Sequence, residues 1–309
     1  MLSRIAEALF WIGRYVERSD GTARILDVHL QLLLEDKWID EDTACRALLS
    51  VMGSEFIPEG AITGEDVVAL LALDRHNSGS IAFAVEQSRE NARRARETIS
   101  TELWECLNAT NSRLPKKVAA DKAHDFFRFV RERAALAIGI ADSATSHDEA
   151  WQFFSLGRAI ERADMTARLL ATRSLTEASG PSWTTILRSV GAYEAYLRTY
   201  RGVPSTKNAA EFLIKDRLFP RSILFSLARA EECLHEIDPQ SGRAGISDEA
   251  QRLIAQTRSQ LEYRPIGDIL DDLPANMESL ERAISGVSEA VRLKFFPTIV
   301  LPVWQGENS

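Results

Sequence analysis

The sequence predicts an all-α protein: a helical bundle that arose by internal duplication and keeps pseudo-twofold symmetry. Apolar residues recur at steps of three and four along most of the chain, which is the helical period. No segment keeps the alternation of period two long enough to build a sheet. Two segments 144 residues apart also share the same charged residues, which indicates a repeat.

The helical period is clearest between Ser80 and Asn108, where one apolar stripe includes Ile81, Val85 and Leu103. We expect a single long helix there, with the Ser80 hydroxyl capping a first-turn amide. Further helices are expected at about 2–34, 41–53, 64–73, 117–144, 148–177, 182–201, 206–215, 220–236, 246–262 and 273–294.

The composition indicates one packed unit. Apolar residues make up 45% of the chain and charged residues 27%, which is an ordinary globular balance, and no low-complexity linker divides the sequence. We therefore expect a single domain over residues 1–309. It would contain pseudo-repeats at about 1–145 and 146–296 and a C-terminal tail at 297–309. Trp11, Trp104 and Trp151 are expected in the core.

The repeat is strongest between residues 9–27 and 153–171, where 10 of 19 positions are identical. The shared residues include Gly13/Gly157, Arg14/Arg158, Glu17/Glu161, Arg18/Arg162, Asp20/Asp164 and Arg24/Arg168. A second match, of Asp74-Arg75, Ser80-Ile81 and Phe83 to the residues 142 positions later, lies at nearly the same offset. Duplication followed by divergence explains both matches.

The shared charges form a stripe along each of the two helices. Glu17 and Arg24 fall on the same side of the helix but lie about 10.5 Å apart along its axis, too far for contact. If the two helices pack antiparallel, Glu17 faces Arg168 and Glu161 faces Arg24, while the two glycines allow a close approach. The alternative is a solvated face, whose ion pairs contribute little. Retention of the charges in both copies favours a buried network.

Candidate functional residues follow from this stripe. Glu17 and Glu161 are the candidate catalytic residues, because a carboxylate beside arginines can act as an acid or a base. Arg89, Arg93 and Arg96 share one helix face and would bind a phosphate or carboxylate, unless they belong to a solvated face. The candidate binding residues are Arg14, Arg18, Asp20, Arg24, Arg89, Arg93, Arg96, Arg158, Arg162, Asp164 and Arg168.

Several classes of site are not expected. A net charge of −8 argues against broad nucleic-acid or anionic-membrane binding. Glu232-x-x-His235 is a single match to a motif that di-metal bundles use twice, so we expect no metal. Nucleotide-binding glycine motifs are missing, and no cofactor is expected. Scattered cysteines and the lack of a signal peptide or a long apolar stretch predict a cytoplasmic protein with no membrane span.

At the signature residues the chain resembles a bacterial family, the alpha-E proteins, named for an all-helical domain with a Glu-Arg motif. The resemblance runs nearly end to end. One departure is Asn77-Ser78-Gly79, where the family usually has an Asn-Pro-Ser-like turn, so we place no site there. The matching residues are Met1–Glu7, Gly13–Arg18, Thr22–Arg24, Leu30–Leu33, Ser80-Ile81, Arg89–Arg93, Arg96-Glu97, Glu102–Asn108, Gly157–Asp164 and Phe219–Ser222.

The resemblance implies a role in making or modifying a peptide or amide-linked molecule. Alpha-E proteins are encoded beside, or fused to, circularly permuted ATP-grasp proteins, and transglutaminase-like peptidases are frequent neighbours. It therefore implies a helical accessory or scaffold partner of an ATP-grasp amide ligase, with a transglutaminase-like peptidase as a second expected partner. Two alternatives stay open: an enzyme of the same pathway that uses the paired Glu and Arg residues, and a purely structural bundle.

Overall fold

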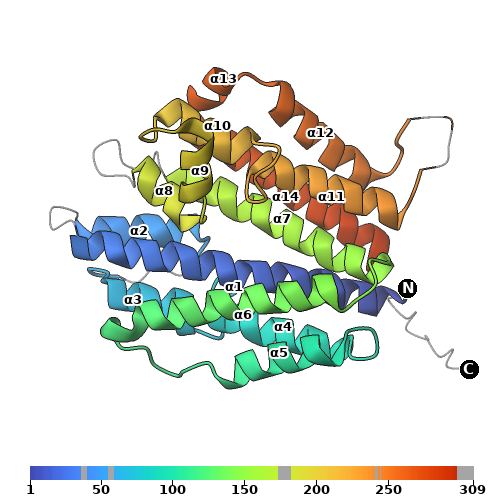
Figure 1. The fold of residues 1–309 in the computed structure, drawn as a ribbon, viewed down its shortest axis with the longest axis horizontal. Helices are drawn as coiled ribbons and strands as arrows, with labels where there is room; N and C mark the ends of the chain where they lie inside the picture. Colours follow the sequence, from blue (N-terminus) through green and yellow to red (C-terminus); the bar gives the residue numbers. More distant parts are fainter. Residues whose placement is uncertain (36–39, 55–58, 173–181, 241–242, 244, 298–309) are drawn as a thin grey trace, which may run out of the picture.

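Every regular element that the structure describes is a helix, which confirms the all-α prediction (Figure 1). The structure is a computed structural model that describes residues 1–35, 40–54, 59–172, 182–240, 243 and 245–297. The predicted C-terminal tail lies almost wholly outside the described residues. None of the described helices combines the length and the apolar character needed to cross a membrane.

The first half of the chain runs from α1 to α6. These helices are α1 (Ser3–Glu35), α2 (Glu41–Val51), α3 (Gly64–Val68, continued by a π-helical turn at Ala69–Leu73), α4 (Ile81–Arg94), α5 (Thr101–Ser112) and α6 (Ala123–Ser143). The second half contains α7 (Glu149–Thr172), α8 (Trp183–Ser189), α9 (Tyr193–Tyr200), α10 (Thr206–Lys215), α11 (Ile223–Ile237), α12 (Glu249–Tyr263), α13 (Ile266–Leu270) and α14 (Leu273–Phe295).

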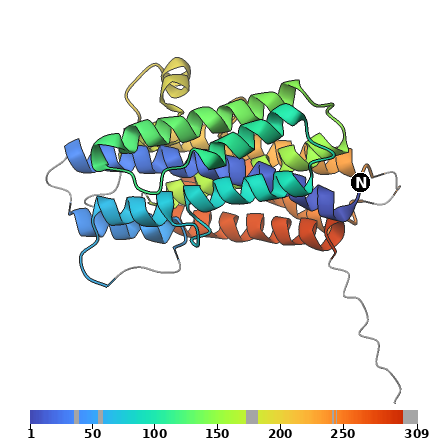
Figure 2. The same cartoon turned by 90° about the horizontal axis from the view of Figure 1, so that it is seen from below.

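The helices α1 and α7 lie side by side at the centre, and each has its own group of helices (Figures 1 and 2). Helix α1 packs against α4 and α6, and α5 packs on both of these. In the same way, α7 packs against α11 and α14, and α12 packs on both. The two groups thus meet along α1 and α7. This arrangement has the form that a pseudo-twofold duplication would produce, although the duplication itself stays a prediction.

Two glycines form the point of closest approach between α1 and α7. A Cβ atom on Gly13 would overlap the carbonyl oxygen of Phe154, and a Cβ atom on Gly157 would overlap that of Phe10. The backbones therefore touch at this crossing, as the sequence predicted. Any larger residue at either position would force the helices apart.

The two central helices run parallel, so the predicted antiparallel packing is wrong. The Met1 amino group bonds Glu149 at 3.1 Å, Gly13 lies against 154–158, and Gly21 contacts Met165 farther along. Residue numbers thus increase together along the pair, as Figure 1 also shows. Twofold symmetry is compatible with both arrangements, because the axis can run parallel to the two helices or perpendicular to them. Glycines at the crossing allow the helices to approach closely, but they do not determine whether the helices run parallel or antiparallel.

Several helices differ from the sequence expectation, and the expected helix at 117–144 begins at Ala123. The predicted helix at 80–108 is two helices, because a turn at 95–100 separates α4 from α5 and Ser100 caps the latter by accepting a bond from the Leu103 amide. The predicted helix at 182–201 breaks at Gly191, whose φ of +66° suits glycine. Helix α13 was not predicted. The expected tryptophans are only partly buried, and Trp11 and Trp104 pack against the core.

Candidate functional site

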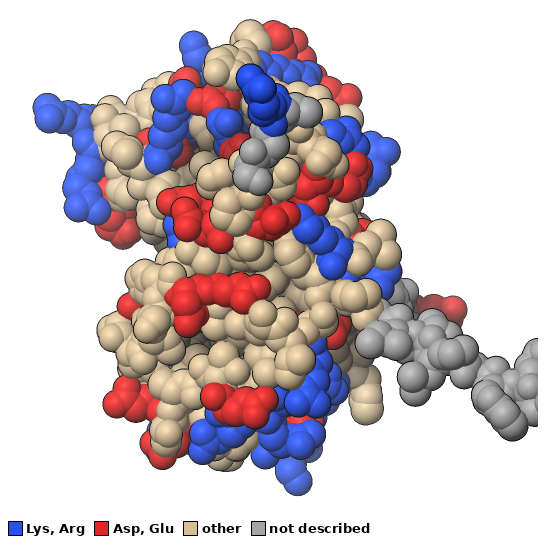
Figure 3. Space-filling model, turned by 90° about the vertical axis from the view of Figure 1, so that its right-hand side faces the viewer, with Lys and Arg blue, Asp and Glu red and all other residues tan. Residues whose placement is uncertain are grey.

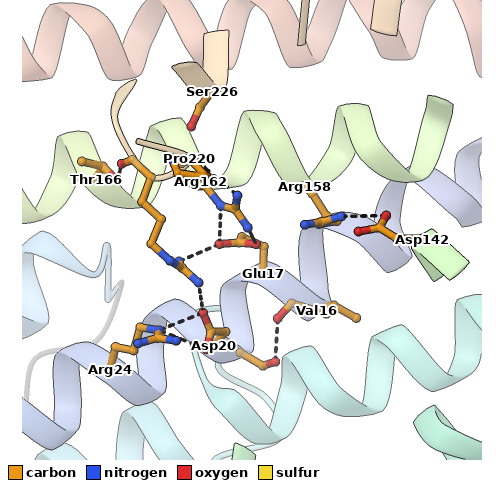
Figure 4. Close-up of polar contacts among 12 residues, drawn as sticks. Val16, Glu17, Asp20, Arg24, Asp142, Arg158, Arg162, Thr166, Pro220 and Ser226 are labelled. Atoms are coloured by element: carbon orange, nitrogen blue, oxygen red, sulfur yellow. Dashed lines mark hydrogen bonds and ion pairs between the residues drawn. The ribbon is translucent and has the colours of Figure 1, made fainter. Parts of the chain in front are cut away.

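Glu17 lies buried between α1 and α7, where two arginines hold its carboxylate (Figure 4). Its side chain is 1% exposed. Arg162 donates from Nε to Oε1 at 2.8 Å and from Nη2 to Oε2 at 2.6 Å, and Arg221 donates from Nη1 to Oε1 at 2.9 Å. Both carboxylate oxygens are therefore occupied by charge-assisted bonds.

Glu161 holds the corresponding place on α7 and is equally buried. Arg14 donates from Nε to Oε2 at 2.7 Å. Arg18 donates from Nε to Oε1 at 2.5 Å and from Nη2 to Oε2 at 3.0 Å. Each glutamate thus takes arginines from the opposite half of the chain. We call the group formed by Glu17, Glu161 and their arginines the ionic joint.

The predicted pairs Glu17–Arg168 and Glu161–Arg24 do not form, because the helices are parallel. In a parallel pair, the glutamate of each helix lies beside the arginine one position after the equivalent glutamate of the other helix, so Glu17 meets Arg162 and Glu161 meets Arg18. Arg24 instead bonds Asp20 four residues earlier, at 3.0 Å, and Arg168 bonds Asp164 at 2.8 Å. Asp20 also accepts a bond from Arg221, which links it to the ionic joint.

Arg221 is a functional residue of the joint that sequence reasoning did not single out. It lies in the turn before α11, where Ser222 caps the helix by accepting a bond from the Phe225 amide. The residue 142 positions earlier is Gly79, so the first half offers no equivalent arginine. The sequence did contain one indication of its importance, because Arg221 lies in the segment Phe219–Ser222 that resembles the family.

Both halves attach the turn before the capped helix in the same way. Arg18 Nη1 donates to the Ser78 carbonyl at 3.2 Å, and Arg162 Nη1 donates to that of Pro220 at 3.3 Å. The hydroxyl of Thr166 likewise donates to the Arg221 carbonyl at 3.1 Å. The signature arginines therefore connect the central helices to α4 and α11 as well as to each other.

The ionic joint keeps both glutamates ionised. Burial by itself raises the pKa of Glu17, but the Arg162 and Arg221 guanidiniums outweigh burial and hold the pKa well below its ordinary value. For Glu161, the attraction of Arg18 and Arg14 likewise outweighs burial and lowers the pKa to about 2. A carboxylate of this kind does not take up a proton near neutral pH.

Arg158 is the exception among the signature arginines. Its counterpart Arg14 bonds Glu161, but Arg158 leaves Glu17 to Arg162 and Arg221 and extends toward Asp142 (Figure 4). Its Nη1 lies 3.5 Å from Asp142 Oδ1, and its buried Nε has no hydrogen-bond partner. Burial lowers the pKa of Arg158, and the neighbouring charge of Arg162 adds to this effect.

The arginines at 89–96 lie away from the ionic joint. Arg89 and Arg93 both pair with Glu90 on α4, and the Arg93 side chain is 61% exposed. Arg96 lies over the Trp104 ring, with its guanidinium carbon 5.2 Å from the ring centroid. Arg75 pairs with Glu86 at 2.8 Å. These ion pairs are of the kind found on a solvated helix face, and the binding role of Arg89, Arg93 and Arg96 stays a prediction.

No group of three or more possible metal ligands occurs within the described parts of the chain. Glu232 pairs with Arg229 at 2.5 Å, and His235 is exposed. His29 is half-buried, its loss of solvent lowers its pKa to about 4, and its Nε2 lies 3.8 Å from the Cys45 sulfur.

The comparison with known proteins agrees with this architecture. The model of the Alpha-E family, described as a predicted alpha-helical domain with a conserved ER motif, matches residues 1–296. An uncharacterized protein of Mycobacterium bovis is 25% identical over 320 residues, and one of Mycobacterium tuberculosis matches equally. Both alignments cover 94% of this chain and 36% of the relative, so the chain spans about a third of the curated relatives' length.

No solved structure matches the chain. The family match covers nearly the whole sequence, including every residue of the ionic joint. The chain has the Glu-Arg pairs Glu17-Arg18 and Glu161-Arg162 within the ionic joint. The chain therefore belongs to the Alpha-E family.

Proposed function

We propose that this chain is a helical accessory or scaffold partner of a circularly permuted ATP-grasp amide or peptide ligase. One observation carries the proposal: the two signature glutamates are held by arginines inside the protein. Glu17 and Glu161 are each 1% exposed and each accept bonds from two guanidiniums. The two carboxylates thus fix how the two halves of a scaffold meet, and arginines occupy the oxygens that a substrate would need.

The length of the relatives supports a role beside another protein. In the mycobacterial relatives, the part that matches this chain is 36% of the polypeptide. The domain is therefore accompanied there by a larger stretch of protein in the same molecule. A helical domain that acts together with an enzyme would be found in such an arrangement.

The catalytic alternative receives less support from the geometry. A general acid or base works best with a pKa near the operating pH. The pKa values of Glu17 and Glu161 are both held below the ordinary range of glutamate. The arginines that lower these values also block access to the carboxylates.

The surface is compatible with docking to a protein partner. On the end of the molecule that carries the N-terminus, acidic side chains gather across the waist, and acidic and basic ones are mixed toward the two ends (Figure 3). A mixed surface of this kind suits contact with another protein, whereas nucleic-acid binding favours a broad basic surface. We also propose that the protein acts in the cytoplasm. Its three cysteines are free and buried, which is compatible with a reducing compartment.

Co-expression with an ATP-grasp protein from the same genome tests the proposal. We expect the two proteins to elute together from a sizing column and the chain to raise the rate of ATP-dependent amide formation. Separate elution together with an unchanged rate would contradict the proposal. The transglutaminase-like peptidase is tested for co-elution in the same way.

The variant Glu17→Gln separates a scaffold from a catalyst. For a scaffold, amide formation per folded molecule stays unchanged. For a catalyst, amide formation is lost even in the folded fraction, which circular dichroism measures. Glu90→Gln, at a surface ion pair, is the matched control.

A further inference from the structure

The second half contains a cavity of about 240 Å³ at the outer side of α7. Ser155 and Ala159 of α7 line it, together with Phe225 of α11. At the positions 144 residues earlier, the first half has Trp11 and Tyr15. Those two rings stack with their centroids 5.2 Å apart, and Tyr15 meets Phe83, the counterpart of Phe225, at 5.9 Å. The cavity therefore occupies a place that the first half fills with aromatic side chains.

Two of the residues that line the cavity each have a buried polar atom without a hydrogen-bond partner. These atoms are Nε of Arg158 and Oγ of Ser155. A buried N–H or O–H group without an acceptor costs about 1–3 kcal/mol. Since the Arg158 side chain is only 16% exposed, bulk water solvates its charge poorly. An acceptor placed beside these two donors would remove this cost.

The first half shows which acceptor this arginine takes. Arg14, the counterpart of Arg158, donates its Nε–H to a Glu161 carboxylate oxygen at 2.7 Å. The corresponding carboxylate for Arg158 would be that of Glu17, but Arg162 and Arg221 already occupy it. The arginine at position 221 thus leaves the Nε–H of Arg158 without its carboxylate.

A further positive charge reaches the same cavity. Arg229 lines it, whereas the residue 142 positions earlier is Gln87. The Arg229 guanidinium lies over the Trp151 ring, 4.8 Å from the centroid, and pairs with Glu232 at 2.5 Å. Trp151 and Phe225 supply apolar surface beside the charges.

We propose that this cavity binds a small organic carboxylate, whose oxygens accept hydrogen bonds from Arg158 Nε and Ser155 Oγ. The organic part would lie against Trp151 and Phe225. The site adjoins the ionic joint, because Arg162 also lines the cavity while its guanidinium holds Glu17. The proposal holds whether or not an ATP-grasp protein is the partner.

The two orphaned donors suit a carboxylate. They are one guanidinium N–H and one hydroxyl, and the two oxygens of a single carboxylate group can accept both bonds. Asp142 also lines the cavity, with a side chain that is 43% exposed, and it accepts a bond from Trp151 Nε1 at 3.2 Å. Its negative charge repels a dianion more strongly than a monoanion.

Nuclear magnetic resonance of the full chain tests the proposal through the arginine Nε–H signals. The signal of Arg158 is the one that disappears in Arg158→Gln. We expect acetate, at constant ionic strength, to shift it saturably and acetamide, its neutral counterpart, to leave it in place. A response to neither probe, an equal response to both, or a stronger response to inorganic phosphate than to acetate would overturn the proposal.

Three variants sharpen the test. We expect Arg158→Gln to weaken acetate binding about 10-fold or more, because a hydrogen bond to a charged group is lost. In this variant binding is read from the indole N–H signal of Trp151, which also lines the cavity. Ser155→Ala retains the arginine signal and weakens binding about 5-fold, which keeps the test valid if Arg158→Gln does not fold. Ala159→Tyr restores the first-half residue and should abolish binding by filling the cavity. Arg128→Gln, at an exposed ion pair on α6, is the control, and an effect there equal to that of Arg158→Gln overturns the proposal.

Discussion

Glu17 and Arg162 lie 145 residues apart in the sequence and meet in a two-bonded ion pair, with nitrogen–oxygen distances of 2.8 and 2.6 Å. The pair is buried at the crossing of α1 and α7. Such a contact fixes the orientation of the two side chains as well as their distance, because two parallel N–H···O bonds hold the guanidinium and the carboxylate in one plane. The stability of the whole molecule should therefore respond to single atoms at this point.

Replacing Glu17 with Gln should lower the free energy of unfolding by about 3–5 kcal/mol, because Arg162 and Arg221 lose their buried counter-charge. Urea denaturation measures the change. Glu90→Gln, which alters an ion pair at the surface of α4, should cost about 0–1 kcal/mol. Equal losses in the two variants would show that the ionic joint is solvated in solution.

Arg14 and Arg158 occupy equivalent positions, but we expect their replacement to have different effects on stability. Arg14→Gln removes a partner of Glu161 and should lower the unfolding free energy by about 3 kcal/mol. Arg158→Gln removes a poorly compensated buried charge and should change the unfolding free energy by about 0.5 kcal/mol or less, or raise it. Thermal unfolding of both variants provides the comparison, and a larger loss for Arg158→Gln would contradict the asymmetry seen at Glu17.

Gly13→Ala should be among the most damaging single substitutions in the chain. Its Cβ atom would overlap the Phe154 carbonyl of α7, so we expect a loss of about 3 kcal/mol or more. Gly139→Ala on α6 is the control, since a Cβ there meets nothing within 4 Å. Alanine at that exposed helical position should stabilise by about 0.5–1 kcal/mol. A tolerated Gly13→Ala would mean that α1 and α7 lie farther apart.

Acid should destabilise the protein through the ionic joint. The pKa of Glu161 is about 2 in the folded state against a reference of 4.5, so the unfolded state binds its proton at higher pH. The stabilisation is fully present above 4.5 and is lost as the pH falls toward 2. The urea concentration at the midpoint of unfolding should therefore decrease as the pH is lowered through this range. Glu161→Gln should show a smaller slope, and an unchanged slope would argue against the assignment.

The cysteines should be unreactive in the folded protein. All three are buried and free, and burial raises the pKa of Cys45 and of Cys233 to about 12. Because the thiolate is the reactive form, an aromatic disulfide reagent should label them only after unfolding. Rapid labelling in native buffer would show that the helices around α2 or α11 open readily.

The sequence predicted the features that depend on periodicity and identity. Apolar spacing located most helices, and the paired glycines correctly indicated where α1 and α7 touch. The burial of Glu17 followed from its retention in both copies. Periodicity shows which face of a helix is covered, but it does not show in which direction the covering helix runs. The antiparallel prediction was wrong because the sequence pattern contains no information on that direction.

Other parts of the site depend on features outside a helix. Arg221 lies in a turn, where no period marks it as inward-facing, yet it reaches both Glu17 and Asp20. The cavity beside Arg158 results from a difference in side-chain volume between Trp11 and Ser155. A volume difference becomes a cavity only if the backbone does not close over it, and that requires the packed structure.

The exchange of arginines between the halves has a consequence for folding. Residues 1–145 provide Glu17 without the arginines that neutralise it, and residues 146–296 provide Glu161 in the same condition. Each half alone would have to bury an uncompensated negative charge or leave its central helix in water. Neither half is therefore a self-sufficient folding unit. Although the chain has two similar parts, it should unfold in a single cooperative step.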